Sequence, residues 1–182
     1  FMARYGELQN AAAAEINKEA DGDNQAGVKA RMALARFLAG SELSYEAIGV
    51  LNLTAKSHPE MLADPEFRGI RGAARAMVRR YKEAENDFSS PALASDAASA
   101  LWRGYIAAKQ NDWTAAKDGF THGMPAMNQF AAAWQARFAR AYAETALQGG
   151  DLSVATTEVA LALAQAHDPA EVLAGQLLQA RL

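Results

Sequence analysis

Three arginines recur at helical spacing near the middle of the chain. Arg68, Arg71 and Arg75 are separated by three and four residues, which places them in one stripe on a helix. Arg103 lies further along the chain, two residues before Tyr105. Guanidinium groups bind carboxylates through paired hydrogen bonds, and a concave wall concentrates their field. We therefore predict that Arg68, Arg71, Arg75, Arg103 and Tyr105 bind an acidic protein segment or a chain-terminal carboxylate.

An alternative interpretation gives the same arginines a role inside the fold. Acidic residues follow the stripe within about three helical turns, at Glu83, Glu85 and Asp87. Oppositely charged side chains on neighbouring helices form ion pairs. The arginines would then be solvated or paired with these acids, and this interpretation stays open beside the binding site.

The histidines and the catalytic motifs give no support for an enzyme. His58, His122 and His167 fall near the ends of different predicted helices, without a second ligand at metal-binding spacing. The sequence has no nucleophile elbow, phosphate-binding loop or HExxH motif, and it contains no cysteine. We predict no catalytic residue, no metal site and no cofactor.

The segment Asp21-Gly22-Asp23-Asn24 is similar to the start of a calcium-binding loop. Such a loop requires a Gly at its sixth position and a bidentate Glu at its twelfth. The corresponding residues here are Ala26 and Met32. We therefore predict an interhelix turn.

The composition indicates a helical protein that binds no nucleic acid. Of the 182 residues 51% are hydrophobic, mainly Ala and Leu, which are strong helix formers. The formal net charge of −3 lacks the basic excess that nucleic-acid binding uses. No apolar run reaches the roughly 20 residues of a membrane span, and no signal peptide is visible. We expect a cytoplasmic or periplasmic bacterial protein without membrane insertion.

Caps and helix-breaking residues predict ten helices. The clearest starts are Asp64-Pro65-Glu66 and Asp168-Pro169-Ala170-Glu171, because Asp accepts hydrogen bonds from free N–H groups and Pro at the first position loses none. Short connections, such as Asn111-Asp112, require successive helices to fold back on each other. The predicted helices span residues 7–19, 25–40, 43–57, 64–80, 81–89, 95–110, 112–123, 128–148, 151–167 and 169–182.

Small residues recur at a fixed interval across these helices. A Gly or Ala on the first helix of each pair lies twelve positions before an Ala on the second, and a large apolar residue follows four positions later. Small residues let two helices approach closely, while large ones fill the space between them. The four sets are Ala35, Ala47 and Leu51; Gly72, Ala84 and Phe88; Gly104, Ala116 and Phe120; and Ala143, Ala155 and Val159. In the last three sets Tyr81, Trp113 or Leu152 precedes the second small residue by three positions.

This pattern resembles the tetratricopeptide repeat (TPR), whose small and aromatic positions match Gly72, Tyr81, Ala84 and Phe88. The resemblance implies an all-α, right-handed α-solenoid of antiparallel helix hairpins, in which the first helices line the concave face. It implies one repeat domain over residues 1–182, cut from a longer bacterial TPR protein; related helix-hairpin solenoids remain alternatives. The expected divisions are a partial unit at 1–24, repeats at about 25–60, 61–93, 94–127 and 128–168, and a partial unit or capping helix at 169–182.

Charge differs between the two sets of helices. The predicted first helices carry a net charge of +8 and the second helices a net charge of −7. If the first helices line the concave face, this face is cationic and favours an acidic partner. Most aromatic residues, among them Trp102, Trp134 and Phe138, are spaced as core residues. Tyr105, three positions after Trp102, lies where repeats of this kind often expose a groove residue, and interior packing stays open as the alternative.

Three functions are compatible with this pattern. The first is a protein-protein interaction scaffold that binds a peptide or acidic protein segment on a basic concave face. The second is a structural spacer within a larger envelope or multidomain protein, with no small-molecule chemistry. The third is a glycan-processing α/α domain, which would need a facing pair of carboxylates that the sequence does not show. We predict the scaffold, and its oligomeric state is left open.

Overall fold

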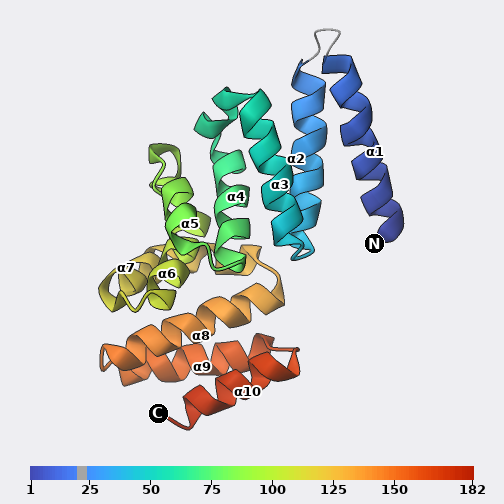
Figure 1. Cartoon of the computed structure of the whole chain (residues 1–182). Helices are drawn as coiled ribbons and strands as arrows, with labels where there is room; N and C mark the ends of the chain where they lie inside the picture. Colours follow the sequence, from blue (N-terminus) through green and yellow to red (C-terminus); the bar gives the residue numbers. More distant parts are fainter. Residues whose placement is uncertain (20–23) are drawn as a thin grey trace. The chain divides into compact units, whose positions relative to one another are not determined.

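The protein is all-helical in the residues that the structure describes. The computed structural model describes the backbone of residues 1–19 and 24–182 and the side chains of residues 1–14 and 26–182. These residues form ten α-helices and three short 3-10 helices, with no strand among them (Figure 1). The predicted all-α class is therefore confirmed. The predicted turn at 21–24 lies outside the described residues, except for the backbone of Asn24 in a helix.

Each predicted helix has a counterpart in the structure. The α-helices are α1 (Met2–Glu19), α2 (Asn24–Gly40), α3 (Ser44–Ser57), α4 (Pro65–Met77), α5 (Tyr81–Phe88), α6 (Ala97–Lys109), α7 (Trp113–Gly123), α8 (Ala132–Gln148), α9 (Leu152–Gln165) and α10 (Pro169–Gln179). The 3-10 helices are η1 (Pro59–Ala63), η2 (Pro91–Leu93) and η3 (Met124–Gln129). The start of α8 was expected at residue 128, but η3 occupies that stretch and α8 begins at Ala132.

The chain folds as two compact units, residues 1–93 and 94–182. The boundary coincides with the one predicted between the second and third repeats, while the grouping of all repeats into one domain stays a prediction. In unit 1 (residues 1–93), α1 to α4 lie side by side and α5 packs on α4 (Figure 1). Leu8, Leu34, Leu38 and Ile48 form one part of its core.

Unit 2 (residues 94–182) contains α6 to α10. Helix α6 packs on α7, α8 packs on α9, and α10 packs on both α8 and α9. The rings of Phe120 and Phe138 are fully buried, and Ala143, Val159 and Leu178 join α8, α9 and α10 in one apolar cluster. Each unit therefore has its own core.

An aspartate side chain caps the N-terminus of five of the ten α-helices in the described residues. The side chain of each accepts a hydrogen bond from a backbone N–H in the first turn, so that one of the free donors at the helix start is satisfied. The bonds join Asp64 to Phe67, Asp96 to Ser99, Asp112 to Ala115, Asp151 to Val154 and Asp168 to Ala170, with distances of 2.8, 2.7, 3.0, 3.2 and 2.7 Å. The two clearest predicted starts are among them.

One turn conformation connects the paired helices in all four cases. A residue in the left-handed region lies five positions before the Ala of each second helix: Glu42, Arg79, Asn111 and Gly150, with φ values of 59°, 63°, 62° and 75°. The next residue donates its N–H to the carbonyl five positions back, from Leu43 to Leu38, Arg80 to Arg75, Asp112 to Ala107 and Asp151 to Ala146, over 2.8–2.9 Å. This is the Schellman arrangement that ends a helix, and its recurrence shows four equivalent connections.

The small residues lie where helix backbones meet. All eight of them are buried, and a Cβ added to Gly104 would lie 2.8 Å from the backbone nitrogen of Phe120. A Cβ on Gly72 would lie 2.7 Å from the ring of Phe88. Of the residues three positions before the second Ala, Tyr81 and Trp113 are half-buried, whereas Leu152 is 55% exposed and does not fill the space that was predicted for it.

Two glycine substitutions test the role of this contact. Gly104→Ala is expected to lower the free energy of unfolding by about 1–3 kcal/mol, because the new methyl group meets backbone that cannot move away. Gly69→Ala is the matched control: it lies inside α4 with nothing within 4 Å of an added Cβ, and should raise the free energy by about 0.5–1 kcal/mol. Urea unfolding of both variants measures the difference, and equal stabilities would contradict the close approach.

Candidate functional site

Three of the predicted binding residues surround one buried acid in unit 1. Arg71 Nη2 lies 2.6 Å from Asp87 Oδ1, and Arg75 Nη1 lies 2.6 Å from Asp87 Oδ2. Arg68 Nη1 is further away, at 3.9 Å from Oδ1. The carboxylate is 1% exposed, and charge-assisted hydrogen bonds from two guanidinium groups offset the loss of its hydration. We call these four residues the Asp87 cluster.

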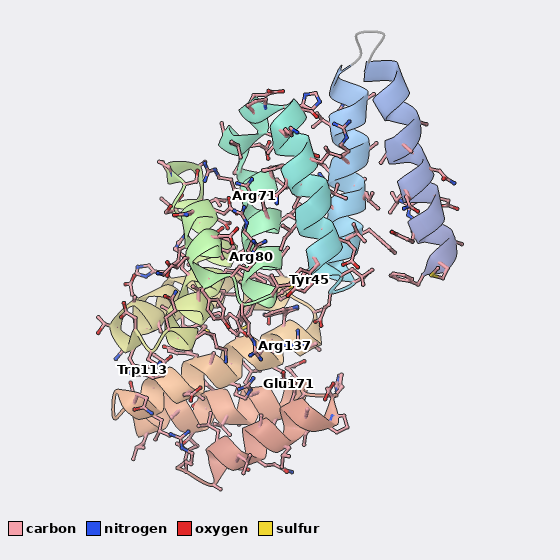
Figure 2. All side chains as sticks on the ribbon, viewed as in Figure 1. Tyr45, Arg71, Arg80, Trp113, Arg137 and Glu171 are labelled. Atoms are coloured by element: carbon pink, nitrogen blue, oxygen red, sulfur yellow. The ribbon has the colours of Figure 1, made fainter. Side chains whose placement is uncertain are left out.

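The surroundings of the Asp87 cluster hold the arginines in place. Arg68 donates to the carbonyl of Asn86 over 2.9 Å, and the Arg71 guanidinium lies 5.0 Å from the centre of the Phe67 ring. Figure 2 labels Arg71 on α4. The structure thus shows the pairing with Asp87 that the alternative interpretation proposed. Binding of an outside partner by these arginines stays a prediction.

Arg103 and Tyr105, the other two predicted residues, lie on α6 in unit 2. Arg103 is half-buried and donates from Nη2 to the carbonyl of Ala94 over 3.3 Å. Burial lowers the pKa of its guanidinium, and the charges of Asp96 and Asp118 oppose this shift. Tyr105 is also half-buried, and its ring belongs to an aromatic cluster.

The aromatic cluster joins α6 to α8. Trp102 and Phe138 are buried beneath three half-buried rings, those of Tyr105, Phe130 and Trp134, which we call the aromatic face. The Trp102 and Trp134 ring centres are 4.5 Å apart, and the Tyr105 ring lies 5.8 Å from Trp134 and from Phe138. Tyr105 is exposed to solvent in part, as a groove residue would be. The spacing predicted Trp134 as core and did not single out Phe130.

Two cations lie against the rings of the aromatic face. The Lys109 ammonium is 5.2 Å from the centre of the Tyr105 ring, and the Arg137 guanidinium is 4.7 Å from the centre of the Trp134 ring. Arg137 and Arg140 also share the carboxylate of Glu171, with Nε to oxygen distances of 3.3 and 3.2 Å (Figure 2). The face therefore offers apolar rings bordered by positive charge, to which an extended segment with apolar and acidic side chains is complementary.

A similar ion pair joins two first helices in unit 1. Arg36 on α2 forms a bidentate pair with Glu66 in the first turn of α4. The hydrogen bonds from Arg36 are the main cause that lowers the pKa of the Glu66 carboxyl. Glu171 lies in the first turn of α10 in the same way. Arginines of one first helix thus bind an acid at the start of the next.

Glu158 in unit 2 is the counterpart of Asp87 without its cations. Each lies three positions after the Ala of the second helix, Ala155 or Ala84. Glu158 is 6% exposed, and its Oε2 has no hydrogen-bond partner in the part of the chain that the structure describes. Burial raises the pKa of its carboxyl group. Sequence reasoning missed this acid because its burial depends on how α9 packs against its neighbouring helices.

The histidines do not come together. His58 is buried at the C-cap of α3, with Nδ1 3.3 Å from a Glu60 carboxylate oxygen, while His122 and His167 are exposed. Among the described side chains, no group of three or more histidines and acids is placed to hold a metal ion. Within the same residues, no helix combines the length and apolar character needed to cross a bilayer.

The Asp87 cluster should dominate the stability of unit 1. Asp87→Asn leaves the buried Arg71 guanidinium without a counter-charge and leaves Arg75 with only its longer pair to Glu83, at 3.5 Å, so the free energy of unfolding is expected to fall by about 3–5 kcal/mol. Arg80→Gln is the control, because Arg80 forms an exposed pair with Glu83 over 2.8 Å and such pairs contribute about 0–1 kcal/mol. Urea unfolding at neutral pH compares the two, and a similar effect of both would contradict a structural role for Asp87.

Removing the charge of Glu158 should raise the stability of the chain, whereas removing that of Asp87 should lower it. A carboxyl group with a raised folded pKa favours the native state while it is protonated, and this contribution is lost as the pH rises from the unfolded pKa through the raised value. Glu158→Gln is therefore expected to be more stable than wild type at neutral pH and similar to it near pH 4. Thermal unfolding across this range measures the effect. A constant difference at every pH would show that the carboxyl does not titrate differently in the fold.

Comparisons with known proteins leave the chain without a family. No family model, no curated protein and no solved structure matches it. The likeness to the TPR therefore rests on the residues and turns described above, and the function is argued from the site alone.

Proposed function

We propose that the chain is a protein-interaction scaffold, built as a right-handed TPR-like solenoid of antiparallel helix hairpins. Two features support the architecture: the small residues that recur twelve positions apart, and the Schellman turn that recurs five positions before each second Ala. Repeats of this kind stack through their neighbours and leave long surfaces for partners.

The aromatic face is the observation that carries the proposal. Tyr105, Phe130 and Trp134 are each partly exposed residues, and side chains of this type are enriched where proteins bind each other. They lie on α6, on α8 and in the connection before α8. The first helices of two successive repeats would thus contribute to one surface. An extended segment of a partner protein would place apolar side chains on these rings.

The charge next to the rings favours an acidic segment. Lys109 and Arg137 lie against the aromatic face, and Arg103 is on the same helix as Lys109 and Tyr105. Arg68, Arg71 and Arg75 contribute less to this proposal than the sequence predicted, because the fold already uses them to bind Asp87. Partner recognition in unit 2 would therefore combine aromatic contact with a smaller electrostatic contribution.

A structural spacer is the second candidate. The ion pairs of Arg36 with Glu66, Arg71 with Asp87 and Arg137 with Glu171 connect helices of the same unit. They favour a module in which the basic residues only hold the repeats together. A spacer of this kind would have no segment-binding surface, so the experiment below separates it from the scaffold.

A displayed peptide library tests the scaffold. Peptides selected on the wild-type chain are expected to be rich in apolar and acidic residues, and Tyr105→Ala and Lys109→Glu should each weaken their binding about tenfold, which is about 1.4 kcal/mol. The Lys109→Glu effect should also shrink at high salt, because the exposed charge is screened. Isothermal titration calorimetry measures both variants.

Lys82→Glu is the control for the charge reversal, since Lys82 is exposed on α5 in the other unit. It should bind the selected peptides as well as wild type does. Recovery of no peptide whose binding depends on Tyr105 or Lys109 would reject the aromatic face and favour the spacer.

A further inference from the structure

Unit 2 has a surface cavity where unit 1 has arginine side chains. Arg71 and Arg75 lie one position before and three positions after Gly72. The residues at the same positions relative to Ala143 are Tyr142 and Ala146. Both of these line a cavity of about 420 Å³ between α7, α8 and α9. The cavity is within the range of about 300–1,000 Å³ that holds ligands, and the short Ala146 side chain leaves space that a long one would fill.

The acid that these arginines bind in unit 1 is still present in unit 2. Glu158 takes the position of Asp87, and its buried Oε2 has no hydrogen-bond partner in the described part of the chain. On α9 it shares one face with Asp151 and Val154, because the three are spaced by three and four residues. Asp151 and Val154 line the cavity, and Glu158 lies one turn further along that face. A buried carboxylate without a counter-charge favours the approach of a cation.

The residues that line the cavity are also suited to a cation. Trp113 and Tyr142 contribute aromatic side chains, and Asp118 contributes a second acid beside Asp151 (Figure 2 labels Trp113). Aromatic rings attract guanidinium groups through their electron-rich faces. Lys117 is the cation among the lining residues and is exposed. The lining residues therefore carry two acids against one lysine, and Glu158 adds a third acid near them.

We propose that this cavity binds an arginine side chain of a partner polypeptide, whose guanidinium group enters past Ala146 and pairs with Glu158. Unit 1 shows the geometry that such a pair adopts: from the position of Ala146, Arg75 reaches its acid with Nη1 2.6 Å from Asp87 Oδ2. The planar guanidinium forms two parallel hydrogen bonds with a carboxylate, which an ammonium group does not. The site lies apart from the residues of the aromatic face and does not rest on the scaffold proposed for that face.

Capped single residues probe the cavity directly. N-acetyl-argininamide is expected to bind with a Kd on the order of 1 mM, as one anchored side chain would. It should shift the amide resonances of α9 around Glu158 in NMR spectra of the whole chain. N-acetyl-citrullinamide has nearly the same shape without the charge, and should bind at least tenfold more weakly. Equal binding of the two, or no shift with either, would overturn the proposal.

Variants of the chain test which acid is used. Glu158→Gln should weaken binding of N-acetyl-argininamide about tenfold, while Glu144→Gln, a control acid on α8, should leave it unchanged. Loss of binding in both variants, or in neither, would reject Glu158 as the anchor. Agmatine separates the two possible sources of the guanidinium group. If it binds at least tenfold more tightly than the capped residue, the site is one for a free small molecule and the proposal of a polypeptide partner fails.

Filling the cavity from within gives a second test that needs no ligand. Ala146→Arg places an arginine at the position of Arg75, so it should pair with Glu158, abolish binding of N-acetyl-argininamide and raise the midpoint of thermal unfolding. Ala146→Met fills a similar volume without charge. It should also block binding, but without the rise. A lower unfolding temperature for Ala146→Arg than for Ala146→Met would show that Glu158 does not accept a guanidinium group there.

Discussion

The close contact between paired helices is the constraint on which the other features depend. In unit 2 the backbones of α6 and α7 meet so closely that a Cβ on Gly119 would lie 2.5 Å from the nitrogen of Gly104. Because backbone atoms make this contact, they cannot move aside for a larger side chain. Only a small residue therefore fits at these positions. The contact also fixes the rotation of each helix about its axis. The number of residues that separate a side chain from the small residue therefore decides whether that side chain lies next to the contact. Residues at the same separation in different repeats can be compared directly.

The segregation of charge between the two sets of helices follows from that geometry. First helices are basic and second helices acidic, and in unit 1 Arg71, one position before Gly72, pairs with Asp87, sixteen positions further along. Other arginines of the first helices bind acids at the start of the next first helix, such as Glu66 and Glu171. The pattern that first indicated a basic groove is thus in large part a pattern of internal pairing. The surface that we propose for a partner is therefore a mixed one, which combines aromatic rings with charge.

Local signals predicted the fold better than they predicted the site. Caps, helix-breaking residues and the twelve-residue interval predicted ten helices and their small positions, because caps and close contacts depend on few neighbouring residues. The turn conformation was missed, since Glu42 and Arg79 hold left-handed positions that a sequence normally marks with Gly. Trp134 and Phe130 were not recognised as a surface, because helical spacing shows which residues share a face and not how far that face is covered. The burial of Asp87 and Glu158 depends on how their helices pack against neighbouring helices, and it has no local signal in the sequence.

The same packing of paired helices leaves the acid of the second helix in two different surroundings in the two units. Packing between paired helices rests on the small residues, so the positions on either side can change without loss of the contact. Where Arg71 and Arg75 occupy those positions, the acid of the second helix is satisfied within the unit. Where Tyr142 and Ala146 occupy them, the helix pair still forms, but Glu158 is buried one turn along α9 from Val154, which lines the cavity, and its Oε2 has no hydrogen-bond partner in the described part of the chain. An unsatisfied buried carboxyl group lowers stability, which a partner's cation would restore. In this fold the identity of two flanking residues therefore decides whether the acid of the second helix is paired within its own unit.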